Sequence, residues 1–193
     1  MITAVILAAG QSRRMGQSKM LLPWGEGTVL SHVISTFLEA GLEDILVITG
    51  GAREQVESAI SHLKVKIIFN EQFAQGEMLS SIQCGIRALT LQMQAVLIGL
   101  GDQPQVQAGS VRAVCEAYRK SKSKIVVPSF NMRRGHPWLV ERPLLGELIA
   151  LKSPQAPRDF LSAHHEEIQY VNVDDPGILA DLDTPEDYRK WRP

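Results

Sequence analysis

Short continuous apolar runs alternate along the chain with longer segments in which apolar residues recur at helical spacing. Continuous apolar runs are typical of strands buried on both faces, and helical spacing predicts amphipathic helices that cover them. This alternation predicts a three-layer α/β architecture with a mostly parallel sheet between two helical layers. Strands are predicted at 2–7, 45–48, 65–69, 95–99, 124–128 and 168–173, with a short run at 138–140, and helices at about 29–38, 53–62, 79–89, 109–118, 144–151 and near 160.

Two helix starts are marked by capping residues. Thr28 precedes the first amphipathic segment and is a suitable N-cap. Near the end of the chain, Thr184 is followed by Pro185 at the first helical position and by Asp187 in the capping-box position. This pattern predicts a last helix that begins at Pro185.

Length and composition indicate a globular chain of ordinary charge. The 193 residues are 45% hydrophobic and 21% charged, so we expect a single domain spanning 1–193. A net charge of -1 gives no general attraction to nucleic acid or to an anionic membrane. The N-terminus enters a strand without a signal segment, so we expect a cytoplasmic protein. Cys84 and Cys115 show no metal-binding spacing and are predicted to be buried thiols.

The stretch from Leu7 to Lys19 is the main candidate for binding a phosphate group. It follows a buried strand, contains Gly10 and Gly16, and carries Ser12 and Arg14 inside the loop. Glycines allow backbone N–H groups to approach an anion, and fixed positive charges strengthen that site. The loop therefore predicts binding of a nucleoside triphosphate.

Two common nucleotide-binding loops do not fit this stretch. A Walker A loop needs Gly-Lys-Ser/Thr after a four-residue gap, whereas Gly10 and Gly16 are separated by five residues and Lys19 follows three positions later. The dinucleotide fingerprint needs three glycines at fixed offsets, and this loop has two.

Two carboxylates are candidates for a magnesium site. Asp102 follows the strand at 95–99, and in open α/β sheets ligands bind beyond the carboxyl ends of strands. Because Mg²⁺ is usually held by one or two carboxylates and by substrate phosphates, Asp102 is predicted as a ligand. Asp183 is a second candidate ligand, although a carboxylate at this place also favours the start of a helix.

Further candidates lie in two later loops. Gly76 and Ser81, with Ser80, are predicted near the ribose or base, and helix capping is the alternative role for the serines. Gly135, His136 and Pro137 are assigned to an acceptor site. His136 is not needed as a general base, because a phosphate nucleophile is already ionised at neutral pH.

These motifs together resemble a known family. Leu7, Gly10, Arg14, Met15, Gly16 and Lys19 match the signature Leu-x-x-Gly-x-x-x-Arg-Met-Gly-x-x-Lys of nucleotidyltransferases with a glycosyltransferase-A-like, or Rossmann-like, fold. Together with Gly101-Asp102-Gln103-Pro104, Gly135-His136-Pro137 and the C-terminal Asp-rich segment, the chain resembles the molybdenum-cofactor cytidylyltransferases, within the MobA-like group.

The resemblance implies that CMP is transferred from CTP to the terminal phosphate of a molybdopterin-type acceptor, with Mg²⁺ and release of pyrophosphate. It implies catalytic roles for Arg14, Lys19 and Asp102, metal binding by Asp102 and Asp183, and nucleotide contacts from Leu7, Ala8, Ala9, Gly10, Ser12, Arg14, Gly16, Lys19, Gly76 and Ser81. A molybdoenzyme partner is a further possibility.

Other functions remain open at the level of sequence. Ala9 and Gln103 favour the cytidylyl side of the group, but a guanylyltransferase and a transferase for sugar or alcohol phosphates share the same loop. A non-catalytic molybdenum-cofactor chaperone would need neither Lys19 nor Asp102. A nicotinamide-dependent reductase is disfavoured by the missing dinucleotide fingerprint.

Overall fold

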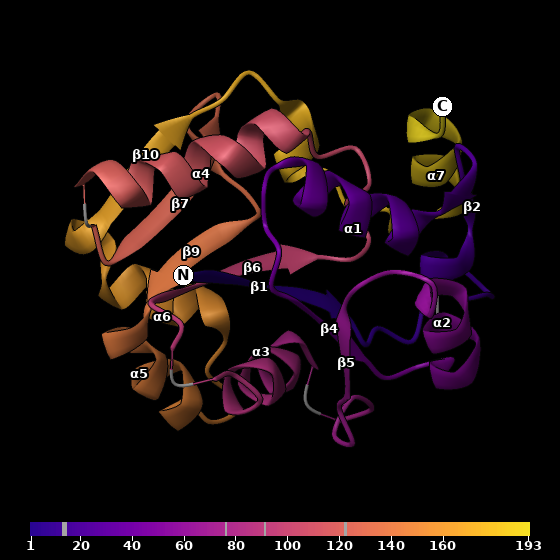
Figure 1. Ribbon diagram of the computed structural model, residues 1–193, viewed down its shortest axis with the longest axis horizontal. Coiled ribbons are helices and arrows are strands. Elements are labelled where there is room, and N and C mark those ends of the chain that lie inside the picture. The colour runs from indigo at the N-terminus through magenta and orange to yellow at the C-terminus, as the bar shows by residue number, and fades with distance from the viewer. Residues whose placement is uncertain (13–14, 76, 91, 122) are drawn as a thin grey trace.

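The computed structural model describes residues 1–12, 15–75, 77–90, 92–121 and 123–193. Within these residues, the centre of the molecule is an eight-stranded sheet with the order β10-β7-β9-β6-β1-β4-β5, and β8 pairs with β7. Figure 1 shows the sheet running between its two outer strands, β10 and β5. The strands are β1 (Ile2–Ala8), β4 (Ile45–Thr49), β5 (Lys66–Phe69), β6 (Ala95–Leu100), β7 (Ile125–Phe130), β8 (Arg133–Arg134), β9 (Trp138–Glu141) and β10 (Ile168–Asn172).

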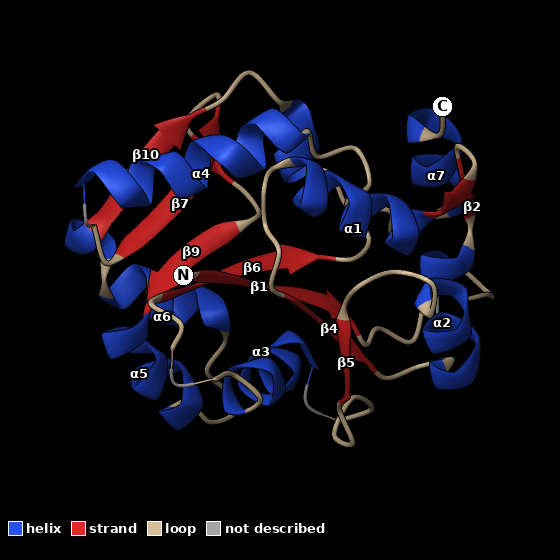
Figure 2. Ribbon diagram, in the orientation of Figure 1, coloured by secondary structure: helices blue, strands red, loops and turns tan. Residues whose placement is uncertain are grey.

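Helices cover both faces of this sheet, as Figure 2 shows. Consecutive side chains of β1 point to opposite faces: Ala4 and Ile6 join one buried cluster, and Val5 and Leu7 join the other. The first cluster includes residues of α1 (Val29–Glu39), α2 (Arg53–Ile60) and α4 (Ala108–Ser121); the second includes residues of α3 (Glu77–Arg87), α5 (Leu145–Ala150) and α6 (Pro157–Ala163). The predicted fold class, a three-layer and mostly parallel α/β architecture, is confirmed.

The strand β9 runs antiparallel to both of its neighbours in the middle of the sheet. β9 lies between β6 and β7 and is antiparallel to both, with Trp138 opposite Ile98 of β6. The start of β9 therefore lies near the carboxyl end of β6. This register brings Gly135 and His136, which precede β9, to the same edge of the sheet as Asp102, which follows β6.

Both predicted helix starts are confirmed. The Thr28 hydroxyl accepts a hydrogen bond from the Ser31 amide at 3.2 Å, and the Thr184 hydroxyl accepts one from the Asp187 amide at 3.2 Å. α7 (Pro185–Trp191) packs against the small hairpin of β2 (Pro23–Trp24) and β3 (Gly27–Thr28), where Tyr188 donates a hydrogen bond to the Pro23 carbonyl at 2.6 Å.

Two further observations concern burial. Cys115 is buried, and this burial raises the pKa of its thiol to about 11. Cys84 is only partly buried. The prediction of two buried thiols is therefore right for Cys115 and wrong for Cys84. In the part of the chain that the structure describes, no helix has the length and apolar character needed to cross a membrane.

Candidate functional site

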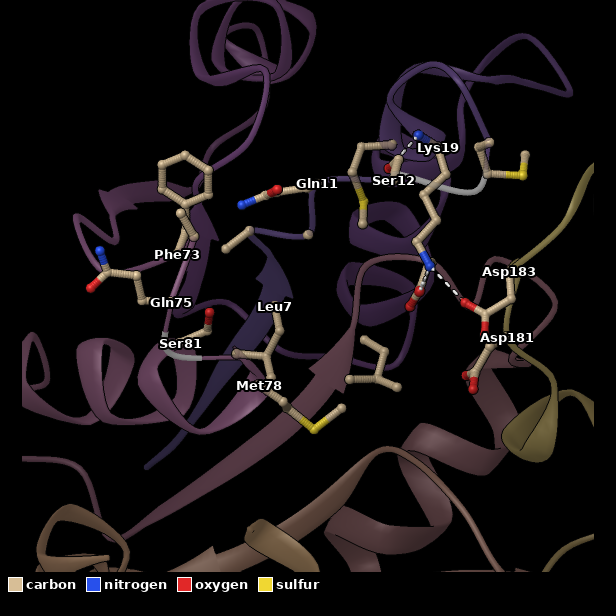
Figure 3. A pocket seen from close by; sticks show the side chains of 17 residues that line it. Leu7, Gln11, Ser12, Lys19, Phe73, Gln75, Met78, Ser81, Asp181 and Asp183 are labelled. Carbon is tan, nitrogen blue, oxygen red and sulfur yellow. Dashed lines mark hydrogen bonds and ion pairs between the residues drawn. The ribbon is translucent and has the colours of Figure 1, made fainter. Parts of the chain in front are cut away.

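A cavity of about 590 Å³ opens beyond the carboxyl ends of β1 and β6. Figure 3 shows side chains from the first loop, from the β5–α3 loop and from residues 181–183 converging on it. Eight of the predicted site residues line this cavity: Leu7, Ala9, Gly10, Ser12, Lys19, Ser81, Asp102 and Asp183. Three separate predicted motifs therefore meet at one place.

The first loop is held in shape by its own hydrogen bonds. The Ser12 hydroxyl accepts a hydrogen bond from the Lys19 amide at 3.0 Å, and the Ser12 carbonyl accepts one from the Met15 amide at 2.9 Å. Met20, which follows Lys19 in a short 3-10 helix (Lys19–Leu21), is buried in the core. Ser12 therefore shapes the loop, and the Met20 anchor fixes the point from which the Lys19 side chain extends.

Lys19 lies between two carboxylates in the cavity. Its ammonium group forms ion pairs with Asp102 and with Asp183, the latter at 3.2 Å, and Figure 3 shows the Lys19 side chain reaching toward Asp183. Burial alone would lower the pKa of Lys19, but the charges and hydrogen bonds of Asp102 and Asp183 outweigh it, so the pKa is raised. Lys19 is therefore a fixed cation at neutral pH.

Asp183 belongs to this cluster as well as to the approach to a helix. It precedes Thr184, the N-cap of α7, yet its carboxylate is directed at Lys19 and lines the cavity. The geometry therefore favours a site role over the helix-terminus role. The cap itself is completed by Asp187, which accepts a hydrogen bond from the Thr184 amide at 2.9 Å.

Asp181 is a third carboxylate at the cavity that the sequence motifs did not single out as a ligand. It accepts a hydrogen bond from the Gln103 side chain at 2.8 Å. Burial, followed by the charge of Asp102, raises the pKa of Asp181. The only sequence signal for it is its spacing of two residues from Asp183.

Residues 175–183, which we call the C-terminal segment, connect the two loops of the site. The Leu182 amide donates a hydrogen bond to the Asp102 carbonyl at 3.2 Å, and the His136 amide donates one to the Ile178 carbonyl at 3.0 Å. Gly135 is required at this contact, because a Cβ atom there would lie 2.2 Å from the Ile178 carbonyl oxygen. The segment thus fixes Asp183 relative to both Asp102 and His136.

Asp175 fastens the start of the C-terminal segment. Its carboxylate is 2% exposed and accepts hydrogen bonds from the amides of Gln107 and Gly177, both at 2.9 Å, and from the Ser110 hydroxyl at 2.7 Å. A buried carboxylate without hydrogen bonds would be costly, and these three donors stabilise it.

Replacing Asp175 by asparagine is expected to lower the melting temperature by about 5 to 10 °C. The amide NH₂ would face donors in place of an acceptor oxygen, a loss of roughly 2 to 3 kcal/mol. Thermal unfolding followed by circular dichroism measures this, with Asp174→Asn as the matched control because Asp174 is exposed. Equal melting temperatures for the two variants would show that the Asp175 carboxylate does not stabilise the fold through these hydrogen bonds.

The two serines of α3 share one partner. The Asn70 side chain donates hydrogen bonds to the hydroxyls of Ser80 at 2.9 Å and Ser81 at 3.1 Å. Both serines lie inside α3, which begins at Glu77, so neither is its N-cap. The helix-capping alternative is therefore wrong, and Ser81 is held at the cavity wall by Asn70.

A second cavity, of about 840 Å³, adjoins the first and shares Gln75 and Met78 with it. Gly135 and His136 line this second cavity, whereas Pro137 is buried and does not line it. His136 keeps some exposure toward the cavity, but protein surrounds its ring, and this desolvation lowers its pKa to about 4. The imidazole is therefore neutral at physiological pH.

Two of the predicted nucleotide-binding residues, Ala8 and Gly16, do not line the first cavity. The Ala8 side chain is fully buried in the core on the opposite face of the sheet, and Gly16 is not among the residues that line the cavity. Arg14 and Gly76 lie outside the described residues. Among the residues that line the first cavity, local motifs also did not single out Gln11, Phe73, Gln75 and Met78.

The donor set suits a divalent cation held jointly with a phosphate ligand. Asp102 and Asp183 face one position, which the Lys19 ammonium group, itself a cation, bridges. Among the described residues no group of three or more His, Cys, Asp or Glu side chains is arranged as a metal site. Mg²⁺ needs no such group, because it takes one or two carboxylates and completes its shell with water and phosphate oxygens.

Comparison with known proteins identifies relatives over the whole chain. The family model described as the MobA-like NTP transferase domain matches residues 4–168. The chain is 31% identical over 188 residues to the molybdenum cofactor cytidylyltransferase of Escherichia coli strain K12, covering 97% of this chain and 93% of that protein.

Solved structures with the same fold also match this chain over nearly its whole length. The crystal structure of Rv0371c from Mycobacterium tuberculosis H37Rv matches with a TM-score of 0.86 and 28% identity, covering 98% of this chain and 96% of the other. A structure of Rv0371C in complex with manganese matches with a TM-score of 0.78 and 26% identity, with coverage of 98% and 96%.

Proposed function

Because this chain belongs to the MobA-like NTP transferase family and is therefore a nucleotidyltransferase, we propose that it transfers CMP from CTP to the terminal phosphate of molybdopterin, releasing pyrophosphate. The observation that carries the proposal is the similarity to a molybdenum cofactor cytidylyltransferase over 97% of the chain. The cluster of Lys19, Asp102 and Asp183 supplies the charges that such a transfer needs.

In the proposed complex the triphosphate lies along the first loop. The amides from Gly10 onward and the Lys19 ammonium group face the β- and γ-phosphates, and Arg14 is assigned to the same phosphates by its place in the motif. These donors are also where negative charge grows as pyrophosphate leaves. A preorganised donor of this kind contributes about 3 to 4 kcal/mol to transition-state stabilisation.

Asp102 and Asp183 are the proposed ligands of Mg²⁺. When bound there, the ion supplies positive charge that neutralises the phosphates around the reacting phosphorus atom. Lys19 now bridges both carboxylates, so binding of the metal–nucleotide complex is expected to redirect its ammonium group toward the phosphates. The carboxylates thus hold Lys19 in place until its phosphate partners arrive.

The acceptor is proposed to lie in the second cavity, beside Gly135 and His136. Its attacking phosphate would reach the nucleotide where the two cavities share Gln75 and Met78. With a pKa of about 4, neutral His136 is a weak base and a hydrogen-bonding partner. Loss of a proton to His136 is not required, because the acceptor phosphate is already ionised.

A single assay tests this function. The purified protein is incubated with Mg²⁺, molybdopterin and each of the four nucleoside triphosphates, and pyrophosphate release is followed. Release that depends on both CTP and molybdopterin is expected. Preference for GTP would indicate a guanylyltransferase. In a parallel reaction a sugar or alcohol phosphate replaces molybdopterin, and release in that reaction alone would change the acceptor. A protein that binds molybdopterin in a separate binding measurement but releases no pyrophosphate would be a chaperone.

Ala9 is proposed to set the preference for a pyrimidine. Ala9 lines the cavity directly after the last residue of β1. The backbone at Gly50 packs closely against it: a Cβ atom built on Gly50 would lie 2.8 Å from the Ala9 Cβ and 2.6 Å from the Phe73 Cβ. Because Ala9 packs tightly against Gly50, it cannot shift away from the cavity, and its methyl group is proposed to limit the space for a base.

Replacing Ala9 by glycine is expected to narrow the ratio of kcat/KM for CTP over GTP by about tenfold, mainly through better use of GTP. One methyl group in a close-fitting pocket discriminates by about 1 to 3 kcal/mol. Ala52→Gly, at the N-cap of α2, serves as the control because Ala52 is exposed and does not line the cavity. An unchanged ratio would assign base selection to other residues.

A further inference from the structure

The second cavity carries an excess of positive charge that the transfer reaction alone does not explain. Arg134, Lys152 and Arg158 line it, and no Asp or Glu is among the described residues on its wall. Within the described part of the chain, none of these three side chains forms an ion pair. The first cavity differs, because Asp102 and Asp183 there pair with Lys19.

The rest of the wall is apolar or carries amides. Trp138, Val127 and Leu161 provide the apolar part, with Trp138 packed 6.4 Å, centroid to centroid, from the Phe160 ring. Gln72, Gln75, Gln83 and Gln155 provide amide groups. A ligand for this cavity therefore combines a compact body of apolar or aromatic character with more than one negative charge.

Hydrogen bonds hold the backbone at Lys152 in place, and its exposed side chain extends from this fixed point. The Gln83 side chain of α3 is hydrogen-bonded to the carbonyls of Leu148 at 3.1 Å, Ile149 at 3.2 Å and Leu151 at 3.0 Å. These bonds tie the end of α5 to α3 and fix the chain where it enters the loop of residues 151–156 that leads to α6 (Figure 1). The Lys152 amide is further bonded to the Gln155 side chain at 3.2 Å.

Lys152 and Arg158 line only the second cavity, whereas Gln75 and Met78 line both cavities. An acceptor whose phosphate meets the nucleotide at Gln75 and Met78 therefore extends away from that junction, toward the two cations. We propose that Lys152 and Arg158 bind a second anionic group of the acceptor, at the end opposite its attacking phosphate. This inference rests on the proposed function and makes the acceptor a molecule with two separate anionic groups and a flat or apolar body.

The inference separates acceptor classes that the nucleotide loop cannot. A simple sugar 1-phosphate or alcohol phosphate has one anionic group, which the transfer reaction uses, and would leave Lys152 and Arg158 without a partner. Molybdopterin carries its phosphate at one end and an anionic sulfur-containing end, with or without molybdenum, at the other. Charge-assisted hydrogen bonds from the two cations to that end would then contribute to both affinity and orientation.

The test uses the double variant Lys152→Gln/Arg158→Gln. Its KM for molybdopterin is expected to rise about tenfold or more, while the KM for CTP changes less than twofold. The wild-type KM for molybdopterin should also rise more steeply with KCl than that of the variant. Arg119→Gln/Lys120→Gln is the matched control, because both residues are exposed at the end of α4, whose buried residues pack on the other face of the sheet.

Equilibrium binding of molybdopterin without nucleotide, followed by fluorescence, separates this inference from the proposed function. Binding that weakens in the double variant supports the inference even if the wild-type protein releases no pyrophosphate, in which case the proposed function alone fails. Equal binding by the double variant and the wild type, or no binding by either, overturns the inference. Comparing metal-free with molybdenum-loaded cofactor identifies which form of the anionic end the two cations recognise.

Discussion

Replacing Lys19 by methionine is expected to lower kcat by about 100- to 1000-fold, the loss associated with removing one preorganised donor to developing charge. The side chain is 12% exposed and lies between Asp102 and Asp183, so a solvent cation or water cannot easily take over its position. Methionine keeps the length and the apolar stem while removing the charge. Pyrophosphate release under saturating CTP and molybdopterin measures the effect.

The fold should survive this replacement. Asp183 is 37% exposed and remains hydrated after Lys19 is lost. Asp102 is 16% exposed, so leaving it without its partner costs about 3 kcal/mol, which a domain of ordinary stability survives. Lys66→Met is the matched control, because Lys66 pairs with Asp44 at 2.9 Å on the surface, away from the cavity. A Lys19 variant whose kcat stays within threefold of the wild type would contradict the assignment.

Replacing Asp102 by asparagine is expected to lower turnover by about 1000-fold and to weaken Mn²⁺ binding in the presence of CTP. Asparagine keeps the shape but loses the charge that a hard divalent cation requires. Asp102 is 16% exposed and held by the hydrogen bond from the Leu182 amide to its carbonyl, so the backbone position should persist. Mn²⁺ binding followed by electron paramagnetic resonance gives a readout that does not depend on turnover.

Asp183→Asn provides a graded comparison. It is expected to weaken Mn²⁺ binding less than Asp102→Asn, because Asp183 is more exposed, and to leave the melting temperature nearly unchanged. Asp44→Asn is the control, since Asp44 also pairs with a lysine but lies outside both cavities. If Asp183→Asn instead lowers stability and keeps metal binding, its role is that of a helix-terminus residue.

The sequence was most informative where a local signal is sufficient. Thr28 and Thr184 act as caps in the structure as predicted, since an N-cap depends on residues within one turn of the helix. Continuous apolar runs likewise predicted the parallel strands on either side of β1, because a strand buried on both faces must be apolar throughout. The loop from Leu7 to Lys19 and the strand-end position of Asp102 follow from the same kind of local pattern.

Sequence pattern was weaker for β9 and for Asp183. The run at 138–140 is short, and nothing in its periodicity indicates that it enters the centre of the sheet antiparallel to β6 and β7. For Asp183, the local pattern is the same for a metal ligand and for a residue before a helix. Its side-chain direction depends on Lys19, which is 164 positions away in the chain.

The sequence by itself determined the layered α/β class, the helix caps and the loop from Leu7 to Lys19, because each depends on neighbours within a few residues. Only the tertiary structure decided that Lys19 pairs with Asp102 and Asp183, that Asp175 fastens the C-terminal segment, and that Lys152 and Arg158 share a cavity with His136. These contacts join distant segments, and their energies depend on burial and direction, which local periodicity does not encode.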